Sequence, residues 1–380
     1  MTIIIFLIIL GLLILSHEFG HFFVAKRSGV RVDEFGLGFP PRLWSIRRGE
    51  TTYSLNLIPF GGFVKIHGEN PDEESLTGSD RKRAINAQPR WIQAAILVAG
   101  VTANLALAWL LLIIAFSTTG LPTQADAVPA GYKLDNPQVT IIQVKENSPA
   151  AQAGLIPGDQ IVQLRATNER LIKPTIEEIQ AFVAAHPDSE IIVGYIRTHG
   201  PSIKPNIAER AVRPAKIGPD GSPRGEAGKP AIGIGLETIG LLRLSLPQAI
   251  IAGTESVWRL TTSTVTAFGS LLVSLFRGQS EILNQVTGPV GLVGLVGDAS
   301  VLGFGYLLLF TALISINLAV LNLLPIPALD GGRLLFLLIE KIKGSPMKPA
   351  VANAFNLTGF VLLMGLMLLV TYSDILKFLT

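Results

Sequence analysis

Residues 3–21, IIIFLIILGLLILSHEFGH, decide the fold class of this chain. From Ile3 to Leu15 the stretch is wholly apolar, and after a polar break at residues 16–18 the run continues, around His21, to Ala25. An α-helix needs about 20 apolar residues to cross a bilayer, so we interpret residues 1–25 as a membrane-spanning helix. No Lys or Arg precedes the run and no A-x-A site follows it, which favours a retained helix over a signal peptide.

The composition agrees with a membrane protein. The chain has 380 residues, of which 49% are hydrophobic and 16% charged, and its mean hydropathy is +0.48. Soluble domains carry about 25% charged residues. The chain has no cysteine, which excludes disulfide frameworks, cysteine zinc sites, iron–sulfur clusters and thiol catalysis.

Three later stretches are also long and apolar enough to span a bilayer. They are Trp91 to Phe116, Val301 to Leu329 and Ala350 to Tyr372. We therefore expect a polytopic α-helical membrane protein with four spans and one inserted α+β domain. Its expected parts are an N-terminal membrane part at 1–117, an extracytoplasmic domain at 118–240, membrane-surface helices at 241–300 and a C-terminal membrane part at 301–380.

The basic residues predict the orientation of the chain. The loop between the first two spans is rich in Lys and Arg, whereas none precedes the first span. The positive-inside rule places this loop in the cytoplasm, with both termini and the inserted domain outside it. The sequence pI near 9.1 therefore reflects membrane topology, and we expect a lipid bilayer and no nucleic acid as a partner.

The inserted domain resembles a bacterial PDZ domain. The string from Ser148 to Ile161, SPAAQAGLIPGDQI, carries the resemblance. Strands are expected at 140–144, 161–164 and 190–196, and a helix at 175–185 that begins with a capping box. Residues 201–230 are rich in Gly, Pro and Lys and are expected to be a mobile insertion. PDZ domains bind extended peptides or C-termini at a sheet edge. The alternative is a spacer that only limits access to the membrane part.

Residues 17–21 form an H-E-x-x-H motif. On a helix, His17 and His21 lie one turn apart on the same face. Two imidazoles at that spacing can chelate one zinc ion, with the adjacent Glu18 as a general base. Ionisable residues at membrane depth are costly and commonly functional. The alternative is a helix end whose His and Glu simply face water.

Asp330 is the candidate third ligand. Catalytic zinc usually takes three protein ligands, and the other histidines lie in the first loop or the inserted domain. Asp330 is the first acid after a long uncharged run. Pro325 and Pro327 precede it and break the helix, which membranes tolerate where the freed backbone is buried or lines a cavity.

The ambiguous segment Leu260 to Phe276 is uncharged but rich in Ser and Thr. It is either a fifth span or a helix on the membrane surface. The wider segment Leu244 to Gly278 would be an interfacial helix that gates substrate entry, or else a spacer. A fifth crossing would put Asp330 and the two histidines on opposite sides of the membrane. We therefore expect a surface helix.

Together, H-E-x-x-H in a first membrane helix and N-x-x-P-x-x-x-L-D-G in a later one resemble the site-2 protease family of intramembrane zinc metalloproteases. The PDZ-like domain makes the chain similar to the bacterial RseP-like branch. Further strings agree, namely PFGGFVK at 59–65, GPVG at 288–291 and SINL at 315–318. The chain departs from the family pattern in two ways. It has room for a single PDZ domain, whereas related members often have two, and it has Arg333 at a position where many members have His.

The resemblance implies a role for each matching residue. Zn²⁺ would be held by His17, His21 and Asp330, and Glu18 would pass a proton from water to the leaving amine. Asn322 would hydrogen-bond the substrate backbone, although Asn also commonly joins membrane helices. The other substrate-binding residues expected are Pro325, Leu55, Leu57, Gly61 and Gly62.

The loop at 35–67 resembles the membrane-re-entrant β-hairpin of the family. Residues 51–58 alternate as a strand, and glycines at 36, 38, 61 and 62 mark turns. The free edge of this strand, around Leu55 and Leu57, is expected to pair with an extended substrate. The alternative is a plain cytoplasmic hairpin.

The resemblance implies a zinc metalloendopeptidase of the bacterial inner membrane that cleaves within transmembrane segments. Typical substrates in the family are anti-sigma factors after a first cut and remnant signal peptides, in regulated intramembrane proteolysis. A catalytically inactive, membrane-anchored PDZ scaffold is the main alternative. A transporter built on the broken third span is a further one, which four spans without an evident inverted repeat disfavour.

Overall fold

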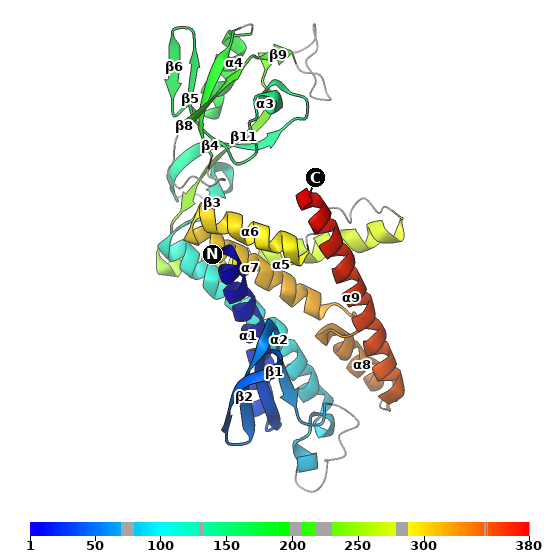
Figure 1. Cartoon of the computed structure of the whole chain (residues 1–380). Coiled ribbons are helices and arrows are strands. Elements are labelled where there is room, and N and C mark those ends of the chain that lie inside the picture. Colours follow the sequence, from blue (N-terminus) through cyan, green and yellow to red (C-terminus); the bar gives the residue numbers. More distant parts are fainter. Residues whose placement is uncertain are drawn as a thin grey trace. The chain divides into compact units, whose positions relative to one another are not determined.

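The computed structural model describes residues 1–69, 80–128, 132–187, 189–197, 207–216, 230–278, 288–345, 347 and 349–379 (Figure 1). The chain divides into two compact units. Unit 1 is Met1–Ile113, Pro247–Ala299 and Leu307–Thr380, and unit 2 is Ile114–Leu246 and Ser300–Tyr306.

Four of the described helices are long and apolar enough to cross a membrane, as expected. They are α1 (Thr2–Arg27), α2 (Arg90–Thr118), α7 (Phe304–Leu323) and α9 (Pro349–Leu379, with the apolar span at Ala350–Leu376). Apolar side chains of α1, such as Phe6, Ile9 and Leu13, pack against Val296 of α6 (Pro289–Leu302) and against partly buried residues of α7. Helices α1 and α7 therefore share an apolar core in unit 1.

The boundaries predicted for the third span are wrong at both ends. Val301 belongs to the preceding helix α6 (Pro289–Leu302), which ends where Gly303 takes a φ of +114° that only glycine adopts readily. At the other end, α7 stops at Leu323, and residues 324–329 are not helical. Asp330 begins the next helix, α8 (Asp330–Lys343). The two prolines thus end the span earlier than apolarity alone indicates.

The segment at 260–276 is the second half of a single helix, α5 (Leu246–Phe276). Trp109 Nε1 donates to Thr254 Oγ1 over 2.9 Å, and Thr264 Oγ1 donates to Asn317 Oδ1 over 3.2 Å. The helix therefore contacts α2 and α7 through polar side chains. Its placement on the membrane surface stays a prediction.

The first loop forms a long bent hairpin of β1 (Val32–Arg48) and β2 (Thr51–Ile66). Residues 34–37 of β1 pair with two parts of β2, residues 52–55 and residues 62–65. Leu55 pairs with Leu37 on one side and with Trp44 on the other. The prediction of a free strand edge at Leu55 is therefore wrong. Among the described strands, residues 62–64 pair on one side only, and they supply an edge instead.

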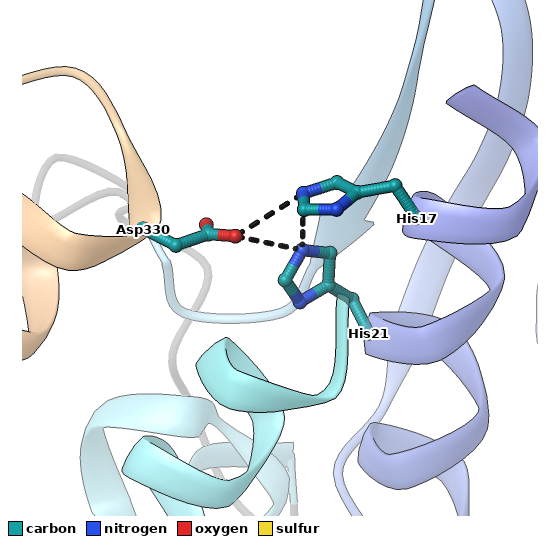
Figure 2. Close-up of side chains that lie close together, drawn as sticks. All are labelled: His17, His21 and Asp330. Atoms are coloured by element: carbon teal, nitrogen blue, oxygen red, sulfur yellow. Dashed lines mark hydrogen bonds and ion pairs between the residues drawn. The ribbon is translucent and has the colours of Figure 1, made fainter. Parts of the chain in front are cut away.

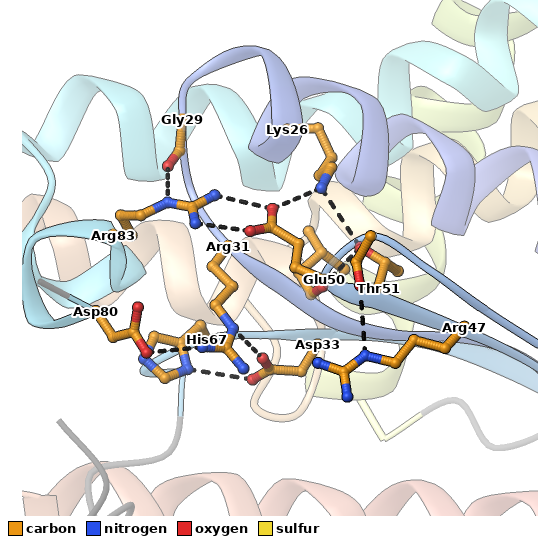
Figure 3. Close-up of polar contacts among 12 residues, drawn as sticks. Lys26, Gly29, Arg31, Asp33, Arg47, Glu50, Thr51, His67, Asp80 and Arg83 are labelled. Carbon is orange, nitrogen blue, oxygen red and sulfur yellow. Dashed lines mark hydrogen bonds and ion pairs between the residues drawn. The ribbon is translucent and has the colours of Figure 1, made fainter.

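A cluster of charged side chains ties the hairpin turn to the end of α1 (Figure 3). Glu50 accepts from Lys26 Nζ over 2.7 Å and from both terminal nitrogens of Arg83 over 2.6 and 2.8 Å. Arg83 belongs to the 3-10 turn η1 (Asp80–Arg83), which η2 (Ile85–Ala87) follows. Arg31 also pairs with Asp80, over 2.8 Å. Three sequence-distant segments are therefore held together at this end of α1.

Unit 2 contains a seven-stranded sheet in the order β3-β11-β4-β5-β7-β8, with β6 on β5. The strands are β3 (Leu121–Gln124), β4 (Leu134–Val144), β5 (Gln160–Ala166), β6 (Glu169–Ile172), β7 (Ile191–Ile196), β8 (Ile207–Val212) and β11 (Ile234–Leu242). The shorter elements are η3 (Ala125–Ala127), α3 (Pro149–Gln152), α4 (Ile176–Ala185), β9 (Ala215–Lys216) and β10 (Pro230–Ala231).

The elements predicted in this unit are largely confirmed. The strands expected at 140–144 and 161–164 lie within β4 and β5, and the one expected at 190–196 matches β7 except for its first residue. Thr175 and Glu178 form the predicted capping box at the start of α4. The expected insertion at 201–230 lies mostly outside the described residues. Its residues 207–212 form β8, whose alternation is too irregular to be recognised in the sequence.

We predict that Glu50→Gln lowers the free energy of unfolding at pH 7 by about 1 kcal/mol, the upper end for exposed ion pairs, because Glu50 accepts from two cations. Hydrogen bonds from Arg83 and Lys26 lower the pKa of Glu50 from 4.5 to about 2. The stabilisation is therefore complete above about pH 4.5 and is lost as the pH falls through about 2.

Thermal unfolding of the purified protein between pH 7 and pH 2 measures this effect. The difference between wild type and variant should narrow across that window. Glu146→Gln removes a charge from an exposed side chain of unit 2 and serves as the control. An equal loss in both variants would contradict the prediction.

Candidate metal centre

Three side chains converge on one point in unit 1 (Figure 2). His17 Nε2 and His21 Nε2 lie 3.2 Å apart, and each lies 3.2 Å from Asp330 Oδ2. Within the described part of the chain, this is the one group of three or more such ligands suited to a metal ion. The structure therefore brings together the three residues named from the sequence as metal ligands.

The two histidines come from consecutive turns of α1. The His21 ring is buried, and its Nδ1 lies 2.7 Å from the backbone oxygen of Ile96 in α2. A carbonyl only accepts, so Nδ1 of His21 carries the proton and donates it. The Nε2 atom of His21 then presents a lone pair to the point of convergence.

Asp330 reaches the histidines because of the break after α7. Gly331 and Gly332 form the first turn of α8, and a Cβ on either would collide with loop carbonyls, those of Leu324 and Ile326 respectively. The Asp-Gly-Gly string thus allows the start of α8 to lie against its own preceding loop. This close packing sets the Asp330 carboxylate opposite the face of α1 that carries the histidines.

The arrangement suits a cation. The Oδ2 atom of Asp330 is buried without a hydrogen-bond partner, although both Nε2 atoms lie 3.2 Å away. Lone pairs that meet at 3.2 Å repel one another unless a positive charge lies between them. Tetrahedral zinc with bonds of about 2.0–2.1 Å places its ligand atoms about 3.3–3.4 Å apart. The donor set and its spacing fit zinc.

A cavity of about 400 Å³ opens beside these ligands. Its lining includes seven of the predicted site residues, namely His17, Glu18, His21, Gly61, Gly62, Asn322 and Asp330. Leu55, Leu57 and Pro325 are not in the lining, and the two leucines have exposed side chains. Glu18, the three clustered side chains and the edge of the hairpin therefore share one cavity, and Leu55 and Leu57 do not line it.

Helix α2 contributes residues that the sequence did not single out. A Cβ on Gly100 would collide with Nε2 of His21 and lie 2.7 Å from Cε1 of His17. Asn104, one turn further along, lies with its Nδ2 atom 3.4 Å from Nδ1 of His17. The sequence shows that Gly100 and Asn104 lie four residues apart in an apolar helix, but this spacing does not indicate which neighbouring helix they face.

One ion pair crosses the rim of the cavity. Arg333 in the first turn of α8 donates to Glu69, which follows the hairpin. Both residues also line a second cavity of about 390 Å³ with several polar side chains. The arginine that departs from the family pattern is therefore bound to a carboxylate and takes no part in the ligand set.

The comparisons with known proteins agree with this geometry. The model of peptidase family M50 matches residues 5–366. The chain belongs to this family. The M50 match extends from α1 into α9, so it includes both motifs and the inserted unit.

Similar M50 proteins match along almost their whole length. A relative from Nostoc sp. (strain PCC 7120), provisionally named a zinc metalloprotease, is 35% identical over 362 residues, covering 94% of this chain and 91% of its own. The zinc metalloprotease RasP of Geobacillus kaustophilus is 29% identical, covering 99% of this chain and 98% of its own. The RasP protein of Shouchella clausii is 28% identical, with 99% of both chains covered.

We predict that Gly100→Ala removes the metal, because the new methyl group needs space that the His21 ring occupies. Metal analysis of the purified protein should fall from one zinc per chain to a small fraction of that. Gly11→Ala in α1 is the matched control, because a Cβ there meets no atom within 4 Å. Full zinc content in Gly100→Ala would show that α2 does not support the site.

Proposed function

We propose that this M50 peptidase is a zinc metalloendopeptidase that hydrolyses peptide bonds within membrane-spanning segments. The observation that carries the proposal is the group of His17, His21 and Asp330 at the end of an apolar helix, beside a cavity that contains Glu18. The names of the RasP relatives support zinc and protease activity.

The residues divide the chemistry between them. His17, His21 and Asp330 would hold zinc, which when bound supplies Lewis acidity toward the scissile carbonyl and makes water more acidic. Glu18 lies between the two histidines in the sequence and lines the same cavity. Its carboxylate would take a proton from the attacking water and deliver it to the leaving amine nitrogen.

An extended substrate is expected at the free edge of the hairpin. A transmembrane helix encloses its own peptide bonds in hydrogen bonds, so cleavage needs local unwinding. Among the described strands, residues 62–64 pair on one side only, and the Cβ position of Gly62 lies 3.4 Å from Glu18 Cγ. A substrate strand added at this edge would pass beside the base. Asn322, half-buried in the same cavity, would hold its backbone.

Unit 2 is proposed to be a PDZ-like peptide-binding domain. A groove of about 750 Å³ lies between α4 and β11. Strand β4 pairs with most of β11 on one side, while β3 on the other side pairs only with residues 239–242. Among the described strands, residues 234–238 therefore pair on one side only, and an extended peptide or C-terminus would add a strand at this edge beside the groove.

The substrates proposed are single-span membrane proteins, such as anti-sigma factors or remnant signal peptides. Localisation in the bacterial inner membrane, with the site toward the cytoplasm and unit 2 outside, is proposed from the positive-inside rule. An inactive PDZ scaffold is disfavoured because the base and all three ligands line one cavity.

We predict that Glu18→Gln reduces cleavage of a single-span model substrate by about 10²- to 10⁴-fold, the usual contribution of general acid–base catalysis. The glutamine keeps the size of the side chain, so zinc should stay at one per chain. The assay uses the purified full chain in detergent, with wild type in parallel. Equal cleavage by both proteins would overturn the assignment of Glu18, and no cleavage by wild type with zinc bound would favour the scaffold.

We predict that a substrate cysteine near the cut forms a disulfide with Val64→Cys but not with Leu57→Cys. The chain has no cysteine, so each variant carries a single thiol. Both residues belong to β2, but Val64 lines the cavity and Leu57 does not. Cross-linking in a Glu18→Gln background keeps the substrate intact. Preferential linkage to Leu57→Cys would place the substrate elsewhere on the hairpin.

A further inference from the structure

Asn104 is a polar side chain buried in the middle of an apolar helix. It has 0% exposure and lies in α2 beside His17 of α1, with the amide 3.4 Å from Nδ1 of the imidazole. Its other amide atom is buried without a hydrogen-bond partner. Ser315 of α7 donates to the Asn104 backbone oxygen over 2.8 Å, and this contact does not involve the side-chain amide.

The proton on His17 decides whether this residue can bind a metal. A neutral imidazole carries one proton, and a ring that coordinates through Nε2 must carry it on Nδ1. For His21 the Ile96 carbonyl imposes this tautomer. His17 has no comparable backbone acceptor at its Nδ1 among the described hydrogen bonds, and Asn104 is the group there.

The orientation of the Asn104 amide therefore selects the tautomer. With the NH₂ group toward His17, Nδ1 accepts, Nε2 carries the proton, and metal binding through Nε2 is blocked. With Oδ1 toward His17, Nδ1 donates and Nε2 offers its lone pair. The two ends of an amide have nearly the same size, and with the NH₂ group toward His17 the amide oxygen is buried without a partner. Only the second orientation suits the ligand set.

We propose that Asn104 is a positioning residue for the metal centre, which accepts the Nδ1 proton of His17 through its side-chain oxygen. It holds the ring in the metal-binding tautomer, as the Ile96 carbonyl does for His21. Ligating histidines commonly donate their second N–H to such an acceptor, and loss of the acceptor costs about 10- to 100-fold in metal affinity.

A neutral acceptor suits the charge of the site. Zinc carries two positive charges, which Asp330 and Glu18 together balance in a buried environment. A carboxylate at position 104 would accept the same proton but leave one uncompensated negative charge. Asparagine supplies the acceptor without that cost.

The test compares Asn104→Leu, which has a similar volume and no acceptor, with Asn104→Asp, which has an acceptor in the same place. Zinc affinity of the purified full chain is measured by competition with a chelator. We expect Asn104→Leu to bind zinc about 10- to 100-fold more weakly. We expect Asn104→Asp to bind at least as tightly as wild type, and the visible spectrum of its Co²⁺ form to match that of wild type.

Two further variants separate the possible failures. Ser315→Ala removes the neighbouring hydrogen bond to the Asn104 backbone and should leave zinc affinity unchanged. The inference rests on the proposed zinc site, which His21→Ala tests by itself. If His21→Ala binds zinc as wild type does, the site is wrong.

If His21→Ala loses zinc but Asn104→Leu binds as wild type does, only the role of Asn104 is wrong. Equal weakening in the Leu and Asp variants would assign Asn104 a packing role and would also overturn the inference. Size-exclusion profiles in detergent identify any variant that fails to fold.

Discussion

The convergence of three lone pairs inside an apolar helix bundle is the constraint on which the rest of the structure depends. His17, His21 and Asp330 present ligand atoms 3.2 Å apart, a spacing that a bound cation makes favourable. The imidazoles can act as ligands because their other nitrogens meet groups of α2. The metal site is therefore a property of the contact between α1 and α2 as much as of the motif on α1.

That contact needs small residues on both helices. Gly20 of α1 lies so close to α2 that a Cβ would collide with the backbone oxygen of Ala99. Gly100 of α2 in turn leaves space for the His21 ring. Ser16 donates to the Ala103 carbonyl over 3.2 Å, which adds a polar link between the same two helices. Helices α1 and α2 are therefore held together by close van der Waals packing and a polar contact. This is usual in lipid, where the hydrophobic effect does not drive helices together.

The third ligand depends on a different device. If residues 301–329 formed one continuous helix, Asp330 would lie further along the axis of that helix and away from His17 and His21. Instead α7 stops before Pro325, and the glycines after Asp330 let α8 start against the loop. The turn of the hairpin is held by the contacts of Glu50 with Lys26 and Arg83. Apolar packing, a helix break and a charge cluster thus each position one of the segments that contribute to the cavity, namely α1, the start of α8 and the hairpin.

The sequence by itself determined the four apolar helices, the ligand triad and the capping box of α4, because each depends on local periodicity or on a short motif. Tertiary structure alone decided which edge of the hairpin is free, where the third span ends, and that Asn104 and Gly100 face the histidines. These features depend on which strand segments pair twice and which helix faces meet. Such contacts join residues far apart in the chain, and an apolar helix carries no periodic signal to show which of its faces will pack.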